Sequence, residues 1–251
     1  MLHKLLFTSL IGAAGVCSLS ASTITFTTAA AAVDTVGEPV SASASVTTGD
    51  GTVSVVLTDL TTNILSAGQL LSDFFFTLGN SFTLSGSSVT PSGVSLITVA
   101  SNGAITADGT SAVPWTLTAC SAVTTTSSTC TGTGSTIHLD SLAGSGGSET
   151  IIGRAAGQTS YPNANSSIAG NPAHNPFISS TATFNFAVTG VTAATTITAA
   201  SFSFGTTANN NVPGVPGGGG GGGGSTTPEP GTLLLSLGGA GLVAFRSFRG
   251  K

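Results

Sequence analysis

Charged side chains are scarce in this 251-residue chain. Only 6% of its residues are Asp, Glu, Lys or Arg, whereas an average soluble domain has about 25%. Arg154 is the single basic residue in the middle of the chain. The others are Lys4 at the N-terminus and Arg246, Arg249 and Lys251 at the C-terminus. A protein needs several cations on one surface to neutralise a row of phosphates, so this distribution excludes nucleic acid as a partner.

The chain is also poor in helix formers and rich in residues that favour strands and turns. Ser and Thr supply roughly 30% of the residues, and there are 35 glycines. Hydrophobic residues reach 40%, which separates the chain from disordered proteins of low hydrophobicity and high charge. The composition therefore predicts a β-rich body with enough apolar side chains to form a core.

The N-terminus has the layout of a secretory signal peptide. A basic start, Met-Leu-His-Lys, is followed by an apolar run from Leu5 to Leu19 and then by small residues. The run is short for a membrane span, which disfavours the alternative of a retained helix. Residues 1–22 are therefore expected to direct export through the Sec machinery and to be removed by signal peptidase.

Residues 228–251 combine three features in a fixed order. About fifteen residues lie between the first and third features, and as a helix they reach about 22 Å, short of the ~30 Å hydrocarbon core. Snorkelling of the flanking basic side chains narrows this gap, and these charges are expected to stay cytoplasmic. The features are the triplet Pro228, Glu229 and Pro230, the apolar run from Leu233 to Phe245, and the basic tail of Arg246, Arg249 and Lys251.

These residues resemble the PEP-CTERM sorting signal of Gram-negative bacteria, a tail also catalogued as an ice-binding protein C-terminal domain. The resemblance implies recognition by an exosortase-like membrane protease, transient anchoring in the inner membrane, and then a location at the cell surface or outside the cell. The apolar run is Gly-rich and short, and Ser247 and Phe248 interrupt the basic tail. Phrases between Glu149 and Thr206 are similar to exported PEP-CTERM proteins whose body has no established activity, so they imply no mechanism.

Between the two ends we expect a body, residues 23–208, and a flexible linker, residues 209–227. The linker is predicted from an Asn run and from the glycines Gly217–Gly224, because glycine-rich chains behave as flexible coils. In the body, alternating apolar residues lie on both sides of Asp50-Gly51, which is typical of a β-hairpin.

Period-two alternation predicts a mainly β fold: an antiparallel β-sandwich or jelly-roll body, followed by a short C-terminal transmembrane helix. One or two helical turns are expected at Ser66–Ser72. The expected strands are Thr23–Thr28, Val40–Val46, Thr52–Val56, Asp73–Leu78, Val94–Ala100, Val113–Ala119, Ala182–Val188 and Thr195–Phe204.

Cysteine usage predicts one disulfide. Once a signal peptide is removed, Cys120 and Cys130 remain, and in an oxidising compartment they are expected to pair. The loop-entropy estimate for so short a loop is nearly ~3 kcal/mol of stabilisation. Two cysteines are too few for a metal site, and their sequence neighbours supply no further ligands, so neither a metal nor a cofactor is expected.

Two clusters of polar residues are candidates for chemistry. His138 and Asp140 lie two apart and share one face of a strand, but no Gly-x-Ser-x-Gly elbow exposes a nucleophile, which disfavours a hydrolase. In the second cluster the asparagines most simply form Asx turns; the alternative is a sugar-binding loop with a tyrosine as stacking platform. This possible ligand loop comprises Tyr161, Asn163, Asn165, Asn171, His174 and Asn175.

The sequence therefore favours an exported, non-enzymatic protein of the surface or extracellular matrix. The alternative is a polysaccharide-binding or adhesive module, with exopolysaccharide as its partner. Ice binding ranks lower, because the Thr-x-Thr pairs of this chain do not recur with the fixed period that an ice-binding face needs. Hydrolysis also ranks lower, because the Gly-x-Ser-x-Gly elbow is missing.

Overall fold

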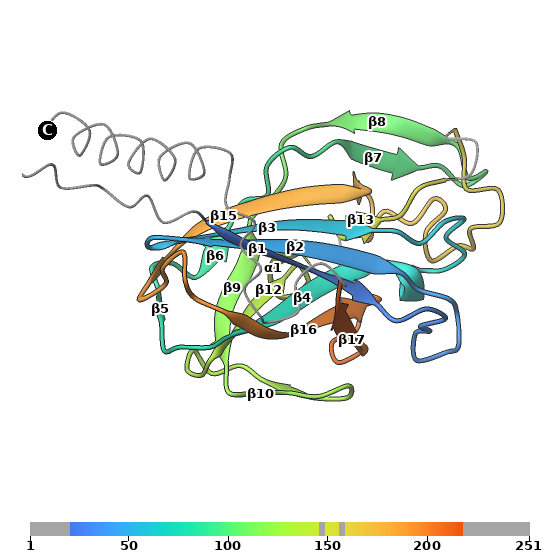
Figure 1. The fold of residues 1–251 in the computed structure, drawn as a ribbon. Coiled ribbons are helices and arrows are strands. Elements are labelled where there is room, and N and C mark those ends of the chain that lie inside the picture. The colour runs from blue at the N-terminus through green and yellow to red at the C-terminus, as the bar shows by residue number, and fades with distance from the viewer. Residues whose placement is uncertain (1–20, 146–148, 156–158, 218–251) are drawn as a thin grey trace, which may run out of the picture. The chain divides into compact units, whose positions relative to one another are not determined.

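The computed structural model describes residues 21–145, 149–155 and 159–217 (Figure 1). Within these ranges the chain is mainly β, as predicted. Its helical elements are the 3₁₀ turn η1 (Ala67–Gln69), inside the expected Ser66–Ser72 segment, and α1 (Leu142–Ser145). The strands are β1 (Ser22–Thr28), β2 (Ala42–Gly49), β3 (Thr52–Asp59), β4 (Leu71–Leu78), β5 (Thr83–Leu84), β6 (Ser88–Val89), β7 (Leu96–Val99), β8 (Ile105–Gly109), β9 (Trp115–Cys120), β10 (Ala122–Val123), β11 (Ser128–Thr129), β12 (Thr136–Asp140), β13 (Ile151–Ile152), β14 (Phe177–Ser179), β15 (Thr181–Thr189), β16 (Ile197–Phe204) and β17 (Asn211–Pro216).

Fifteen of these strands belong to one large, mostly antiparallel sheet. Its order is β5-β15-β3-β2-β1-β17-β16-β4-β13-β14-β7-β8, with β12, β9 and β6 branching from β4. The pair β13–β14 is parallel, and β10 with β11 forms a separate two-stranded sheet. Because β17 pairs with β1 on one side and β16 on the other, it joins the two halves of the sheet.

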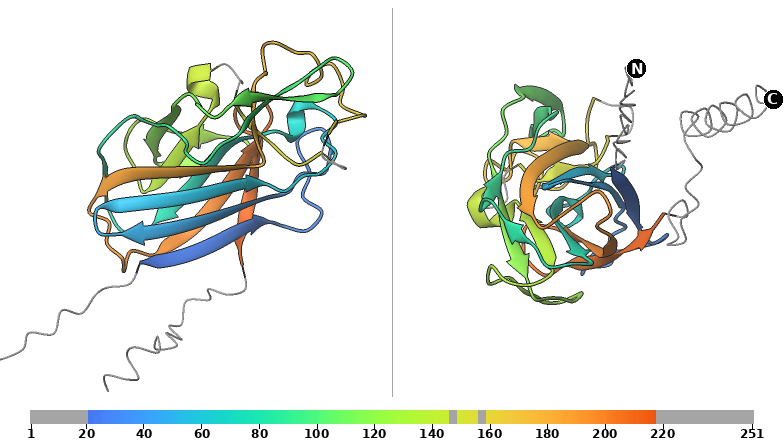
Figure 2. Two further views of the ribbon diagram at one scale, coloured as in Figure 1. Left: turned by 90° about the horizontal axis from the view of Figure 1, so that it is seen from above. Right: turned by 60° about the vertical axis from the view of Figure 1, so that its left-hand side comes forward.

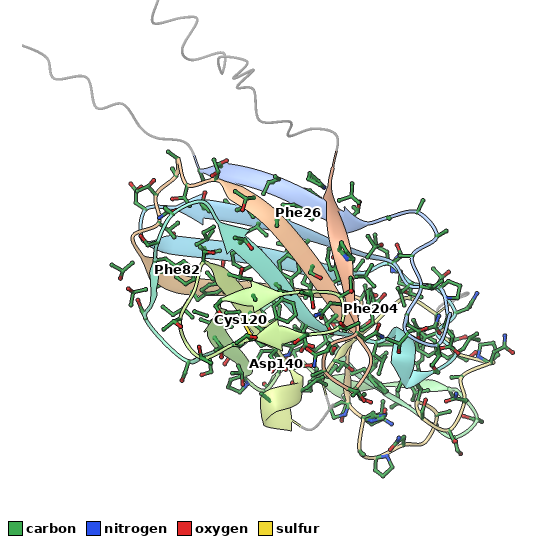
Figure 3. The ribbon with its side chains drawn as sticks, turned by 90° about the horizontal axis from the view of Figure 1, so that it is seen from below. Phe26, Phe82, Cys120, Asp140 and Phe204 are labelled. Atoms are coloured by element: carbon green, nitrogen blue, oxygen red, sulfur yellow. A yellow bond between two sulfur atoms is a disulfide. The ribbon has the colours of Figure 1, made fainter. Side chains whose placement is uncertain are left out.

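The two halves share one apolar core. Strands β1, β2, β3 and β15 contribute one set of buried side chains, and β4, β9, β12 and β16 contribute the other, including Phe202 and Phe204. Trp115 on β9 meets Phe184 on β15 with ring centroids 4.9 Å apart. Phe26 and Phe204, labelled in Figure 3, both belong to this core. The period-two pattern of the sequence therefore reflects strands with one face turned inward.

The predicted hairpin is confirmed. Strands β2 and β3 pair from Ala42 opposite Asp59 to Gly49 opposite Thr52, so the turn lies at Asp50-Gly51. Gly51 has a φ of 69°, a left-handed conformation that glycine adopts without a Cβ clash.

The expected linker, residues 209–227, begins too early. Asn211–Pro216 form β17, with Val212 opposite Phe202 on one neighbour and Val215 opposite Thr27 on the other. Pro and Gly in this stretch were interpreted as linker residues, whereas the buried Val212 fixes it in the sheet. The segment after Gly217 lies outside the described residues.

The described body begins and ends on neighbouring strands. Strand β1 runs away from Ser22, and its antiparallel neighbour β17 returns as far as Pro216, which lies opposite Phe26. The first and last strands of the described body are therefore side by side (Figure 2). The signal peptide expected at residues 1–22 overlaps β1 by one residue, since Ser22 pairs with Thr48.

Residues 1–20 and the whole sorting signal, residues 228–251, lie outside the described residues. The expected transmembrane helix falls in that part of the chain. Within residues 21–145, 149–155 and 159–217, every helix is too short and too polar to cross a membrane.

Candidate functional site

The outer face of strand β4 carries polar side chains, and yet it is buried. Successive side chains of a strand point to opposite faces, so Phe74 and Phe76 enter the core while Asp73, Phe75 and Thr77 point the other way. On this outer face Asp73 is 2% exposed and Phe75 is 3% exposed. Their neighbours in the register are Asp140, His138 and Thr136 on β12, and Ser203, Ser201 and Ala199 on β16.

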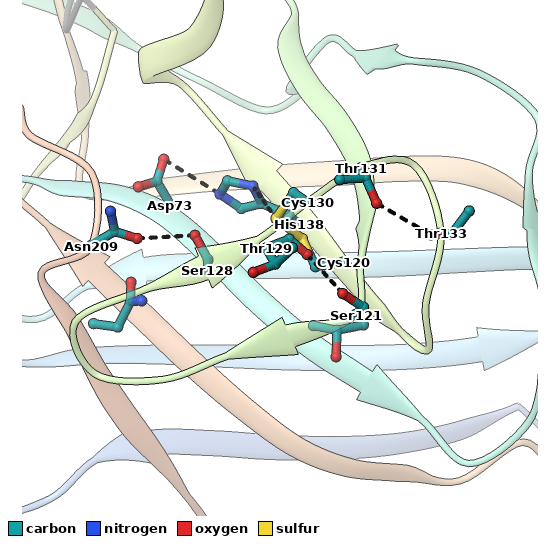
Figure 4. The surroundings of a disulfide bond; sticks show 12 residues. Asp73, Cys120, Ser121, Ser128, Thr129, Cys130, Thr131, Thr133, His138 and Asn209 are labelled. Atoms are coloured by element: carbon teal, nitrogen blue, oxygen red, sulfur yellow. Dashed lines mark hydrogen bonds and ion pairs between the residues drawn. A yellow bond between two sulfur atoms is a disulfide. The ribbon is translucent and has the colours of Figure 1, made fainter.

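A disulfide-bound hairpin lies beside this outer face. Cys120 ends β9 and Cys130 follows β11, with their Sγ atoms 1.93 Å apart (Figure 4), which confirms the predicted pairing. The enclosed hairpin, β10–β11, also contacts the start of β17 and the residues just before it. Ser128 Oγ lies 3.1 Å from Asn209 Oδ1, and Asn211 Nδ2 donates to Thr124 O at 2.7 Å. The hairpin is therefore fixed at both sides of its tip.

Between this hairpin and the sheet lies a groove of about 510 Å³. Its walls combine Ser and Thr hydroxyls with apolar side chains, and most of the lining surface is apolar, as in sites where a few polar groups orient a ligand. It is lined by Phe75, Thr77, Ser121, Ala122, Val123, Thr124, Thr125, Ser135, Thr136, Ala199, Ala200, Ser201 and Pro213.

His138 lies beside the disulfide, and Phe75, Cys130 and Asp73 surround its ring. The imidazole stacks on Phe75, with ring centroids 3.9 Å apart and an angle of 8° between the planes. Its Nδ1 lies 3.7 Å from Cys130 Sγ, and its Nε2 lies 3.9 Å from Asp73 Oδ1 (Figure 4). The ring can therefore neither tilt nor turn without losing a neighbour.

Asp140 completes this cluster from the far end of β12. It lies directly opposite Asp73 in the register of the two strands. Its Oδ1 accepts hydrogen bonds from the backbone N–H groups of Leu142, at 2.6 Å, and Ala143, at 3.1 Å. The carboxylate thus caps the start of α1, and this fixes its orientation (Figure 3).

Burial sets the charge states of the cluster. Burial, together with the neighbouring Asp140 carboxylate, raises the pKa of Asp73 well above its ordinary value. Burial lowers the pKa of His138 to about 4, against the opposing pull of Asp140. Two carboxyl groups and a neutral imidazole therefore share a site in which positive charge is scarce.

Two overlapping groups of side chains have the spacing of metal ligands: Asp73, His138 and Asp140, and Cys120, Cys130 and His138. In each group the ligand atoms lie within 4.8 Å of one another. From the sequence, no further ligands were expected near the cysteines, because His138 approaches them only through the pairing of β9 with β12. The i, i+2 spacing of His138 and Asp140 indicated that these two side chains share one face of a strand. Nothing in the sequence indicated that Asp73, which is far away along the chain, lies beside them.

The geometry of His138 does not resemble a catalytic triad. Its two ring nitrogens face Cys130 and Asp73, and no hydroxyl among the described residues is recorded as its hydrogen-bond partner. The nearby Ser72 hydroxyl instead interacts with Asp73 Oδ2 and Ser203 O. A nucleophile paired with a base is the arrangement that acyl transfer requires.

Tyr161 does not form the stacking platform that the alternative of a sugar-binding loop requires. Tyr161 is only 2% exposed, and its hydroxyl donates to Gly153 O at 2.5 Å. Its ring packs with Ile97, Ile168 and Phe177 in a second apolar cluster. A sugar ring cannot stack on a side chain that is already enclosed in the core.

The other residues of the possible ligand loop mainly bind one another, as the Asx-turn interpretation predicts. Asn165 Oδ1 accepts from Ser167 N, and Asn171 Oδ1 accepts from Ala173 N. Asn175 Oδ1 accepts from Val99 N, and the hydrogen bond between His174 Nδ1 and Ser167 O is 2.6 Å long. Asn163 is exposed. These polar groups hold the loop in shape rather than forming one open site.

Comparison of the chain with protein families, curated proteins and solved structures finds no match.

Proposed function

We propose that this protein is an exported, non-enzymatic protein of the cell surface or extracellular matrix, sorted by its PEP-CTERM-like tail. In this proposal the Sec machinery and signal peptidase process the N-terminus. An exosortase-like protease then recognises Pro228-Glu229-Pro230, and the inner membrane holds the tail only transiently. The folded sheet serves as a β-sandwich-type domain for display.

The observation that carries the proposal is the placement of the two ends of the body. Strand β17 runs antiparallel to β1 and ends at Pro216, opposite Phe26, so the last strand of the body lies next to the first. The N-terminal export signal and the C-terminal sorting tail therefore join the body at two adjacent strands.

The disulfide and the charge pattern support export. Disulfides persist in oxidising compartments and are rare in the cytosol, and Cys120 is bonded to Cys130. The hydroxyl-rich outer faces of β1 and β2 keep water-compatible groups on the surface with very few charges, as in the exposed contacts between Thr23 and Thr47 and between Thr25 and Ser45.

Sorting is tested by replacing Pro228, Glu229 and Pro230 with alanine in the producing cell. The prolines keep the triplet extended, as a protease substrate must be, so full-length precursor should accumulate in the inner membrane. Alanines at Ser225, Thr226 and Thr227 are the matched control and should leave sorting unchanged. Cell fractionation and mass spectrometry of the C-terminus give the readout. A triplet variant found at the surface with the wild-type C-terminus contradicts the proposal.

A second candidate, polysaccharide binding, is favoured by the hydroxyl-lined groove under the β10–β11 hairpin. Ala199 lies on the exposed side of this groove, so Ala199→Trp should block it and abolish retention on an exopolysaccharide affinity column. Ala107→Trp, on the exposed strand β8, is the control. Equal retention of both variants excludes the groove as the binding site.

A further inference from the structure

We propose that Asp73, His138 and Asp140 bind one divalent transition-metal ion of the zinc class beside the disulfide-bound hairpin. The three residues come from β4 and β12, which are adjacent antiparallel strands. This inference rests on the described residues alone and does not depend on the proposed sorting or on the location of the protein.

The spacing of the candidate ligand atoms suits a small cation. One atom from each of the three side chains lies within 4.8 Å of the others, and His138 Nε2 is 3.9 Å from Asp73 Oδ1. Zinc binds nitrogen and carboxylate oxygen at about 2.0–2.2 Å, so two ligands of a tetrahedral ion lie about 3.4 Å apart. A contraction of roughly 0.5 Å therefore closes the His138–Asp73 distance to that of a zinc site.

Unpartnered buried atoms point into this space. Asp73 is 2% exposed and His138 is 8% exposed. Within the described residues, Asp73 Oδ1 and His138 Nε2 have no hydrogen-bond partner. A buried polar atom without a partner costs about 1–3 kcal/mol, and a cation between these two atoms would satisfy both at once.

The surrounding residues already hold the ligands in position. His138 is stacked on Phe75, and its other nitrogen, Nδ1, faces Cys130 Sγ. Asp140 is oriented by the backbone N–H groups that it accepts at the start of α1. Outer contacts of this kind orient the ligands in known metal sites.

The local charge also favours a cation. Within residues 21–145, 149–155 and 159–217, Arg154 is the only Lys or Arg. The neighbour of Asp73 that could carry a positive charge is the imidazole of His138, with Nε2 at 3.9 Å from Oδ1, and it is neutral. Two neighbouring carboxyl groups without a basic partner are stabilised either by a shared proton or by a metal ion, and a metal ion also satisfies His138 Nε2.

The ligand set selects the class of metal. Calcium takes six to eight oxygen ligands and magnesium usually keeps several waters, whereas imidazole suits zinc, copper, iron and nickel. Cys120 and Cys130 are not ligands while they are joined in the disulfide, because a metal binds the thiolate. Three protein ligands leave at least one position of a four-coordinate zinc ion open.

The test uses the purified full chain, stripped with a chelator, and titrates it with Zn²⁺ by calorimetry and with Co²⁺ by visible absorption. We expect one ion per chain, a higher unfolding temperature in the presence of zinc, and a Co²⁺ spectrum without a thiolate charge-transfer band. Asp73→Asn and His138→Gln preserve side-chain size, and each should weaken binding at least tenfold. Asp50→Asn and His174→Gln, outside the cluster, should bind like the wild type.

Two further measurements separate the proposal from its alternatives. Circular dichroism of each variant reports folding, and an Asp140→Asn variant provides a third ligand change if one of the other two does not fold. Joint replacement of Cys120 and Cys130 by serine should retain the ion. Loss of the ion in that variant alone, no stoichiometric binding by the wild type, or undiminished binding by all three ligand variants overturns the proposal; the last two results fit a shared proton between Asp73 and Asp140.

Discussion

The two halves of the sheet share one apolar core but differ on their outer faces. In β2, buried and half-buried residues alternate along the whole strand, so its outer face meets solvent. In β4, every residue from Leu71 to Phe76 is buried, and the β10–β11 hairpin and its disulfide lie beside the outer face. The open half contacts water through Ser and Thr hydroxyls, whereas the covered half encloses Asp73, Phe75 and His138. Covering a second face is what converts polar strand residues into a buried cluster.

The difference teaches where specific chemistry can arise in a chain with so few charges. On an open face, water screens charges and competes for hydrogen bonds, so a side chain keeps nearly its ordinary properties. On the covered face, the pKa of Asp73 rises and the pKa of His138 falls because both groups have lost water. Burial of the outer face of β4 therefore sets the electrostatics of the cluster.

The largest expected effect comes from emptying the covered face. Phe75→Ala removes a ring that is 3% exposed and stacked on His138, and phenylalanine to alanine changes in buried sites cost about 3–5 kcal/mol. Ser45→Ala on the open face of β2 should change stability by less than ~0.5 kcal/mol. Urea unfolding followed by the fluorescence of Trp115 measures both variants. Equal effects of the two would show that the outer faces do not differ.

Removal of the disulfide should have the next largest effect. Joint replacement of Cys120 and Cys130 by serine should lower the free energy of unfolding by nearly ~3 kcal/mol, because the short loop is no longer closed in the unfolded chain. Hydrogen exchange should rise in the β10–β11 hairpin and in β12, while β2 and β3 keep their protection. A uniform loss of protection across both halves would contradict the idea that the disulfide serves the covered face.

Much of the sheet could be predicted from the sequence, because several of the predicted strands, such as Val40–Val46 and Ala182–Val188, show a two-residue period. Strand β12 is missing from the expected strands, although Ile137 and Leu139 alternate with Thr136, His138 and Asp140, and His138 and Asp140 were placed on one face of a strand. Strand β17 was missed because Pro213, Gly214 and Pro216 indicate a linker in isolation.

The candidate site was less accessible to sequence reasoning than the strands. The cluster depends on the register that sets Asp73 opposite Asp140 and Phe75 opposite His138, and this register is a property of two strands far apart in the chain. Local periodicity identifies which face a residue occupies, but it does not identify the partner across the strand. The sequence around Tyr161 likewise does not indicate that its ring lies in the core.

The open half of the sheet also contains a buried acid, Asp59, at the end of β3. Burial raises its pKa to about 8, against the hydrogen bonds donated by Thr61. Tyr161 is its titratable neighbour. In the unfolded chain the pKa is about 3.9, so between these values the folded state binds more protons. The contribution of Asp59 to the free energy of unfolding is therefore largest below about pH 4. It falls by about 1.4 kcal/mol per pH unit as the pH rises toward 8.

Asp59→Asn should remove this slope, because the amide resembles the neutral acid in shape and does not ionise. Free energies of unfolding measured between pH 5 and 8 for the variant and the wild type give the difference in slope. Asp50→Asn, on the exposed β2–β3 turn, is the control and should keep the wild-type dependence. Parallel curves for the wild type and Asp59→Asn would exclude a raised pKa at Asp59.

The smallest expected effect compares one hydroxyl pair on each outer face. Thr77 Oγ1 and Thr136 Oγ1 lie 2.8 Å apart in the groove wall, and Thr136 is 7% exposed. Thr23 Oγ1 and Thr47 Oγ1 are also 2.8 Å apart, but in solvent. Thr77→Val keeps the shape of the side chain and leaves the Thr136 hydroxyl without its partner, at a cost of about 1 kcal/mol. At Thr23→Val, water replaces the lost partner, so the change should be within ~0.5 kcal/mol.

Denaturant unfolding of these two variants and of the corresponding double variants, Thr77→Val with Thr136→Val and Thr23→Val with Thr47→Val, separates the pair interaction from the loss of each hydroxyl. The covered pair should recover part of its cost in the double variant, because no buried hydroxyl then lacks a partner. The open pair has no such cost to recover, so its double variant should equal the sum of the single ones. A covered pair that behaves like the open one would mean that water reaches Thr136 under the hairpin, and the covered face would then differ from the open face in shape but not in solvation.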